Sequence, residues 1–298
     1  MEKRVFKFGK TSSAMILPKK WIDKSNLKPD EPLFVSENER GDLVISLRER
    51  SKKEFEIKIN SKFNPKLIGR WVGNLYLYGL SKIKISSDDK FTEDQFKEIE
   101  DEIKAECSGF EITHQTNSEI LIEDFTDLKE ISIDKIISRL RYLIKQQFDE
   151  ARENNVKTIR KIENLVDRFE RIGKRYLNIV EPKDTLKYFS VLSLLENISD
   201  NILLIMDNFK IDTKSFEELS KAFDTCFDGL EGKYESIQKT SEARNKVYEM
   251  MKKSKADKLL VHLVKKISDN ISQISEFGLK KEEPTIKLDE WTKIKKQV

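Results

Sequence analysis

The hydrophobic positions of this 298-residue chain change their spacing twice, and the changes divide the chain into three regions. In the first region, short apolar runs alternate with turn-forming residues, which is typical of short strands. Arg4–Leu17 predicts two strands around a glycine- and hydroxyl-containing turn, and Pro18 begins a short helix. Leu33–Val35 and Leu43–Leu47 predict two further strands. About fifty residues in this ββαββ order bury little apolar surface alone, so we expect them to dimerise.

The second region alternates between strand and helix spacing. Strands are indicated by apolar residues at every second position, and helices by apolar residues three and four positions apart. Thr92 precedes an acidic helical turn and is a suitable N-cap. The predicted elements are strands near 55–59 and 83–85, helices at 65–78 and 91–105, and a hairpin formed by 110–112 and 118–122. Their order, βαβαββ, predicts a compact α+β module.

The third region, from Ile131 onward, has helical spacing almost throughout. Three long apolar stripes at 133–148, 159–176 and 186–209 predict three helices, and three more are predicted near 216–232, 236–253 and 256–277. The sequence Ile-Ser-Asp-Asn-Ile occurs at 198–202 and again at 267–271, in the third and sixth of these helices. The pattern therefore predicts a six-helix bundle built from two copies of a three-helix unit.

The predicted fold class is multidomain α+β. We divide the chain into an N-terminal β domain at 1–50, an α+β connector at 51–128, a helical bundle at 129–280 and a basic tail at 281–298. The tail combines lysines with apolar residues, including Trp291, and fits either a short helix that binds an anionic surface or a partner, or a segment packed on the bundle.

Charge is balanced over the whole chain but not within its N-terminal region. The chain has 56 basic and 53 acidic residues, yet residues 1–20 contain six basic side chains and one acidic one. Lysine, arginine, serine and threonine are common donors to DNA phosphates, although exposed turns often contain the same residues simply because they are solvated. The candidate DNA-contacting residues are Arg4, Lys7, Lys10, Thr11, Ser12, Ser13, Lys19 and Lys20.

Residues 3–48 resemble the AbrB/MazE/SpoVT swapped-hairpin family. The resemblance is carried by Gly9-Lys10, Ile16-Leu17-Pro18-Lys19-Lys20-Trp21, Leu27-Lys28-Pro29-Asp30-Glu31 and Leu43-Val44-Ile45. It implies a homodimeric, DNA-binding fold. The family usually has Gly then Asp after Lys-Pro, whereas this chain has Asp30-Glu31. Because Asp tolerates a positive φ less well than Gly, we expect this turn to be strained or rebuilt.

The helical region resembles PhoU, the phosphate-uptake regulator fold, over about residues 130–279. The resemblance is carried by the duplicated three-helix unit and its Glu-x-x-x-Asp spacing. In the connector, Leu67–Val72 and Ser108–Ile112 look like the segment that joins the two ends of archaeal PhoU-like regulators. The resemblance implies a role in phosphate uptake, contact with a phosphate transporter ATPase or a sensor protein, and a divalent metal or iron held by the bundle.

Two carboxylate pairs fall where this resemblance places metal ligands. Glu163 and Asp167, and likewise Glu196 and Asp200, are four residues apart and project from one helical face. The predicted ligands are Glu163, Asp167, Glu196, Asp200 and Asp269. Chance is a strong alternative, because 53 acidic residues in 298 give about nine acidic pairs at this spacing. In the second copy, moreover, Lys265 and Lys246 stand where carboxylates would be needed, and a lysine there would repel a cation or replace it with an internal salt bridge.

Several other classes of protein are disfavoured. The chain lacks Gly-rich phosphate loops, and its two histidines have no neighbouring pattern typical of nucleophilic catalysis, so we expect a non-enzyme. Two widely spaced cysteines and no N-terminal apolar run favour a cytoplasmic protein. The apolar stretch Val191–Met206 contains Glu196 and Asp200, which argues against stable membrane insertion.

The sequence therefore predicts a homodimeric transcriptional regulator of phosphate uptake that binds promoter DNA through its N-terminal domain and senses through the helical bundle. The competing interpretation is a scaffold that docks on a phosphate transporter ATPase and uses its N-terminal domain only to dimerise.

Overall fold

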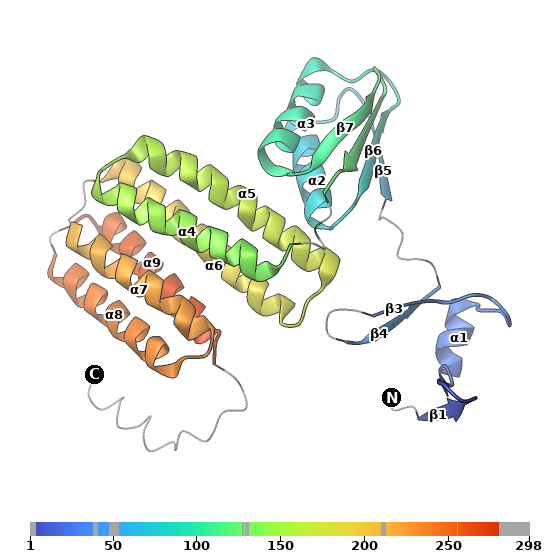
Figure 1. Cartoon of the computed structure of the whole chain (residues 1–298). Helices are drawn as coiled ribbons and strands as arrows, with labels where there is room; N and C mark the ends of the chain where they lie inside the picture. Colours follow the sequence, from blue (N-terminus) through green and yellow to red (C-terminus); the bar gives the residue numbers. More distant parts are fainter. Residues whose placement is uncertain are drawn as a thin grey trace.

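The computed structural model describes residues 4–37, 41–47, 54–126, 128, 131–209, 213–254 and 256–279. The fold is mixed α+β, with small strands at the N-terminus followed by an α/β region and then by long helices (Figure 1). The predicted basic tail at 281–298 lies outside the described residues.

The N-terminal region consists of two hairpins around a short helix, in the predicted ββαββ order. The elements are β1 (Val5–Phe8), β2 (Ser12–Met15), α1 (Lys19–Ser25), β3 (Phe34–Glu37) and β4 (Leu43–Ser46). Each hairpin is antiparallel, with Lys7 opposite Ser13 in the first. Gly9 provides the turn with a φ of +71°, which glycine adopts without strain. Asp30 adopts a φ of +67°, so the turn that departs from the swapped-hairpin pattern does use a conformation that Asp adopts less readily than Gly.

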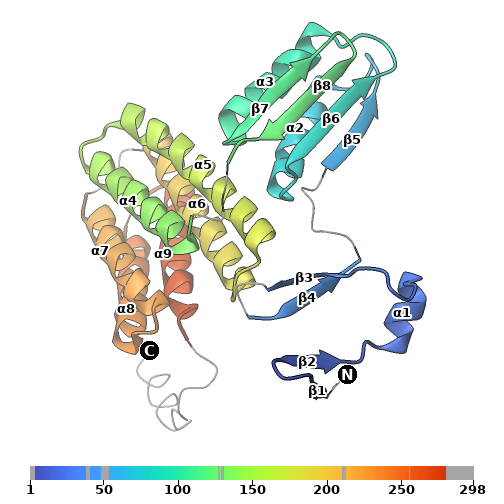
Figure 2. The same ribbon diagram turned by 45° about the vertical axis from the view of Figure 1, so that its right-hand side comes forward.

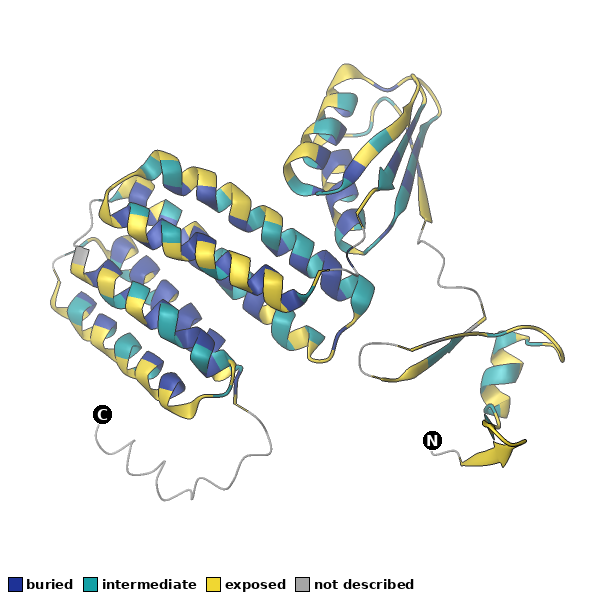
Figure 3. Cartoon of the chain, in the orientation of Figure 1, coloured by how far each residue is buried: buried dark blue, intermediate teal, exposed yellow. Residues whose placement is uncertain are grey.

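The described residues of the N-terminal region form no core of their own. None of its residues whose burial the structure describes is buried (Figure 3). Large apolar side chains are left in solvent: Val5 is 64% exposed, and Phe8 and Leu43 are each 69% exposed. Apolar surface of this extent on so short a segment is unfavourable in water, and it needs another surface to cover it.

The connector is a four-stranded sheet with two helices on one face (Figure 2). The elements are β5 (Glu54–Ile59), α2 (Pro65–Leu77), β6 (Lys82–Ser87), α3 (Glu93–Glu106), β7 (Phe110–Gln115) and β8 (Glu119–Asp124). This confirms the predicted βαβαββ order. The strand order is β5-β6-β8-β7, with β5 and β6 parallel because α2 crosses between them. Thr92 caps α3 in a complete capping box with Gln95, as the sequence predicted for the cap.

The bundle contains the six predicted helices. They are α4 (Ile133–Arg152), α5 (Val156–Val180), α6 (Thr185–Asn208), α7 (Thr213–Leu230), α8 (Tyr234–Lys253) and α9 (Lys258–Glu276). They surround one continuous apolar core that includes Leu140, Phe148, Leu195 and Phe223. The duplicated motif lies on α6 and α9, which pack against each other. The isoleucines of both copies, at 198, 202, 267 and 271, are buried in this core.

Helix α6 is the most apolar element of the bundle. It is the one helix in the described part of the chain that is long and apolar enough to cross a membrane by length and composition alone. Half of that apolar stretch is buried inside the bundle, and core helices of soluble proteins meet the same criterion.

One fully buried arginine joins the connector to the bundle. Arg175 on α5 has no solvent exposure and donates to the backbone carbonyls of Tyr76 and Leu80 and to the carboxylate of Asp124. Its guanidinium also lies 4.5 Å from the centroid of the Tyr76 ring and 4.9 Å from that of Phe110. A buried charge is tolerated only when it is paired and hydrogen-bonded in this way.

Candidate functional site

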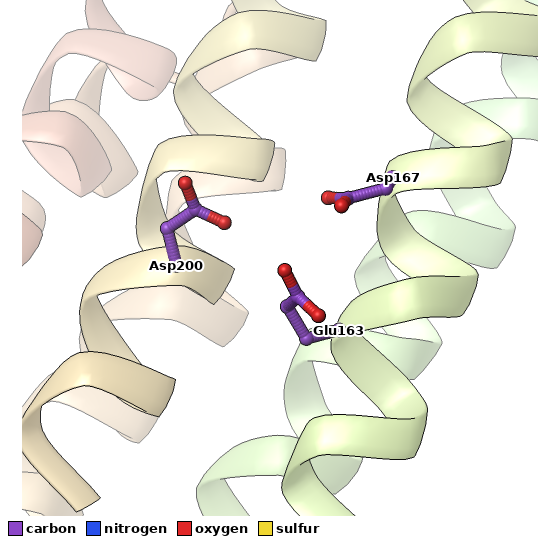
Figure 4. A group of neighbouring side chains, drawn as sticks. All are labelled: Glu163, Asp167 and Asp200. Carbon is purple, nitrogen blue, oxygen red and sulfur yellow. The ribbon is translucent and has the colours of Figure 1, made fainter. Parts of the chain in front are cut away.

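The two predicted carboxylate pairs face each other across the α5–α6 contact. Because α5 and α6 are adjacent in sequence and pack side by side, residues four apart on each helix point into the same seam. Glu163 and Asp167 project from α5 toward Asp200 on α6 (Figure 4). One carboxylate oxygen from each of these three residues lies within 4.8 Å of the other two. We call Glu163, Asp167, Glu196 and Asp200 the carboxylate cluster.

Crowding and partial burial raise the proton affinity of this cluster. Loss of solvent, followed by the charges of Glu163 and Asp200, raises the pKa of Asp167 to about 8. Loss of solvent and then Asp200 raise the pKa of Glu196 to about 7, and the same two causes raise the pKa of Glu163. Like charges this close cannot all ionise without cost, so the cluster favours any cation that neutralises it.

The geometry and chemistry of the cluster fit a hard cation. Oδ1 of Asp167 is buried and has no hydrogen-bond partner, which leaves an acceptor without a donor. The donor set consists of carboxylate oxygens from two facing helices, which suits Mg²⁺, Mn²⁺, Ca²⁺ or iron better than it suits soft metals. Glu163, Asp167 and Asp200 are placed to hold such an ion, and Glu196 lies beside Asp200 at the edge of the same seam.

The corresponding positions in the second half of the bundle have different neighbours and form no carboxylate cluster among the described residues. Asp269 on α9 is not part of the carboxylate cluster and accepts a hydrogen bond of 2.6 Å from the Tyr248 hydroxyl. The Nζ of Lys265 lies 4.8 Å from the centroid of the Tyr248 ring, and Lys246 forms a 2.8 Å ion pair with Glu218. In this half Lys246 pairs with Glu218 and the Tyr248 hydroxyl donates to Asp269, so Asp269 does not join the other four predicted ligands.

The predicted DNA-contacting residues are all accessible. Lys7, Ser12 and Ser13 lie on the first hairpin, while Lys10 and Thr11 form its turn with Gly9. Lys19 and Lys20 begin α1, directly after Pro18. Each of these side chains is exposed, and so is Arg4. The hairpin and the start of α1 therefore offer a set of cationic and hydroxyl donors to solvent.

Sequence reasoning missed a second group of charged residues, next to the carboxylate cluster. A cleft of about 460 Å³ lies where α2 and α3 of the connector meet α5, and α6 contributes one residue to its lining. We call it the junction cleft, and it is lined by Arg70, Glu102, Glu106, Asp167, Glu170, Arg171, Lys174 and Glu196. Arg171 pairs with Glu106 at 3.1 Å and with Glu102 at 3.5 Å. Asp167 and Glu196 were already predicted as metal ligands, but in the sequence the other lining residues look like ordinary solvated helix positions, and only the docking of the connector brings them together.

Comparison of the chain with models of protein families, with curated proteins and with solved structures found no match.

Proposed function

We propose that the chain is a homodimeric, DNA-binding transcriptional regulator of phosphate uptake, in which a PhoU-like helical bundle senses the signal. The N-terminal region would form a swapped-hairpin dimer of the AbrB type, and the bundle would bind a divalent metal or iron at the carboxylate cluster.

The observation that carries this proposal is the exposure of the N-terminal region. Its hairpins leave Phe8 and Leu43 69% exposed while they also present Lys10 and its neighbouring hydroxyls to solvent. A second copy would cover the apolar side chains, and the cationic turns of both copies would then form one donor surface. Phosphate contacts from lysines and hydroxyls fix a protein on duplex DNA, and base-edge contacts from a residue such as Arg4 add sequence preference.

The carboxylate cluster supports a sensory role for the bundle. It concentrates negative charge in one seam, and Oδ1 of Asp167 lacks a donor, so occupancy by a cation would change local stability substantially. The second half of the bundle, in which Lys246 pairs with Glu218 and Lys265 lies over the Tyr248 ring, would serve as scaffold.

DNA retardation with the full-length protein tests the proposal. The probes are the promoter of the protein's own gene and promoters of phosphate-transport genes, with a promoter-free fragment for comparison. Lys10→Glu with Lys20→Glu should abolish retardation at moderate salt. At low salt, where the variant still binds, the slope of log binding constant against log salt concentration should be shallower than in the wild type by about two per chain. Each lost phosphate contact removes about 0.9 from that slope.

The matched control is Lys157→Glu with Lys161→Glu, which makes the same charge change at exposed positions of α5. Retardation that survives the hairpin change, or that is lost equally in the control, would show that this surface does not bind DNA. A wild-type protein that ignores these promoters but co-purifies with a phosphate transporter ATPase would favour the scaffold interpretation instead.

A further inference from the structure

The junction cleft joins the carboxylate cluster to the connector domain. On the bundle side it contains Asp167 and Glu196 of the cluster, and on the connector side it contains Glu102 and Glu106 of α3. Arg171 lies between the two groups. It is one helical turn after Asp167 on α5, and its guanidinium reaches across to α3.

Arg171 makes the principal polar contact between α3 and α5. Its Nε lies 3.1 Å from a Glu106 carboxylate oxygen and also donates to the Glu106 backbone carbonyl at 3.2 Å. Its Nη2 lies 3.5 Å from Oε1 of Glu102. The side chains of Arg171 and Glu102 are each only 21% exposed, so solvent screens this pair less than an ordinary surface ion pair.

Gly73 on α2 leaves the space that this pair occupies. A Cβ atom at position 73 would lie 1.9 Å from Oε1 of Glu102 and 2.6 Å from Nη2 of Arg171. Both atoms are at the ends of flexible side chains, so an alanine would push the pair aside without requiring the backbone to move. The ion pair between Arg171 and Glu102 therefore fits in this position only because residue 73 has no side chain.

The charges of the cleft do not balance. Five carboxylates and three cationic side chains line it, which leaves an excess of two negative charges when all of them are ionised, with Glu163 and Asp200 just beyond. Docking of the connector brings Glu102 and Glu106 toward carboxylates that already repel one another. A cation in the cluster offsets that repulsion. Undocking would instead weaken cation binding, because Arg171 would lose its ion pairs with Glu102 and Glu106. Its guanidinium would then be free to turn toward Asp167 and compete with a cation.

We propose that cation binding at the carboxylate cluster is coupled to docking of the connector through Arg171 and the two α3 glutamates, so that a bound divalent cation holds the connector against the bundle. The coupling rests on the proposed cation site. It gives the bundle a physical route to the connector and, through it, to the N-terminal region.

Coupling of this kind is reciprocal, which makes it measurable from either side. If the cation favours the docked state, the docked state binds the cation more tightly by the same factor, and a change that undocks the connector lowers cation affinity by up to that factor. Couplings between sites in proteins are commonly about 5- to 150-fold. We expect about a tenfold loss of Mn²⁺ affinity when the α3 charges are removed.

The experiment titrates Mn²⁺ calorimetrically into metal-free, full-length protein and follows hydrogen–deuterium exchange of α3 with and without Mn²⁺. The test variant is Glu102→Gln with Glu106→Gln, and Gly73→Ala displaces the same ion pair while every charge is kept. The control is Glu100→Gln with Asp101→Asn, which removes two charges from the same helix outside the cleft.

The coupling predicts that Mn²⁺ slows exchange of α3 in the wild type, that both test variants lose at least about fivefold in affinity, and that the control stays within about twofold. Equal affinities in the test variants and the wild type, or exchange of α3 that ignores Mn²⁺, would overturn the coupling and leave the cation site standing. A wild type that binds no Mn²⁺ would instead overturn the cation site, and the coupling with it. The exchange measurement needs no variant, so misfolding of a variant does not prevent a decision.

Discussion

Replacing Asp167 by asparagine should stabilise the metal-free protein above neutral pH. The folded chain holds this carboxylate against Glu163 and Asp200, and its buried Oδ1 accepts no hydrogen bond. Asparagine has nearly the same shape but carries no charge, and its amide can donate to a neighbouring carboxylate. The substitution therefore removes the repulsion and can put an N–H donor in place of the unpaired acceptor.

The sign of the pH dependence follows from the direction of the pKa. Asp167 titrates near 3.8 in an unfolded chain and at about 8 in the folded protein, so the folded state binds its proton more tightly. Asp167 therefore does not lower the free energy of unfolding below about pH 4, and it lowers that free energy progressively as the pH rises toward 8. The raised pKa of Glu196, about 7, acts in the same direction.

The magnitude is bounded by the same values. Between the unfolded pKa of 3.8 and pH 7, Asp167 can lower the free energy of unfolding by at most about 4 kcal/mol, at about 1.4 kcal/mol per pH unit. The side chain is only partly buried, so solvent screening reduces the effect, and we expect Asp167→Asn to stabilise by about 1–2 kcal/mol. For a helical domain of this size that is a rise of about 3–6 °C in Tm.

Thermal unfolding followed by circular dichroism, in chelator and at pH 5, 6, 7 and 8, measures this effect. The variant should melt above the wild type at pH 8, and the gap should narrow toward pH 5. Glu217→Gln, at an exposed carboxylate of α7, is the control and should move Tm little at any pH. A variant that melts at or below the wild type at pH 8, or a gap that does not depend on pH, would refute the assigned repulsion.

Three further outcomes follow from the packing. Arg175→Ala should destabilise the chain by about 3–5 kcal/mol, because it strands a buried carboxylate and two carbonyls, and urea unfolding of the two domains should then separate into distinct transitions. Cys107, whose pKa burial raises to about 12, and the buried Cys226 should both react with a thiol reagent at pH 8 only after unfolding; rapid labelling of the native protein would contradict their burial. Thr92→Ala should cost about 1 kcal/mol by removing the capping box with Gln95, whereas Thr92→Ser should cost far less, and a thermal melt of each compares them.

Local patterns in the sequence determined the elements of this protein. Period-2 and period-3.6 spacing identified the strands and helices of all three regions, since each element must place its apolar residues on one face to bury them. The cap at Thr92 was predictable because it depends only on residues within one turn. The repeated Ile-Ser-Asp-Asn-Ile likewise identified the two related helices before their packing was known.

Part of the carboxylate cluster was also predictable, because residues four apart must share a helical face. What spacing did not determine is that the two faces meet: Glu163 and Asp167 oppose Asp200, whereas Asp269 pairs with a tyrosine in the other half. That distinction depends on which helices pack together and on the lysines nearby.

Only the tertiary structure decided the order of strands in the connector sheet, the burial of Arg175 and the ion pairs of Arg171. The strand order depends on pairings such as β5 with β6, 28 positions apart, and Arg175 and Arg171 reach acidic partners 51 or more positions away, so no local preference specifies them. An arginine in a helical pattern looks solvated until a second domain covers it. The physical reason is that local propensity acts within a turn or a strand pair, whereas burial and charge pairing are properties of surfaces that meet only after the domains have folded.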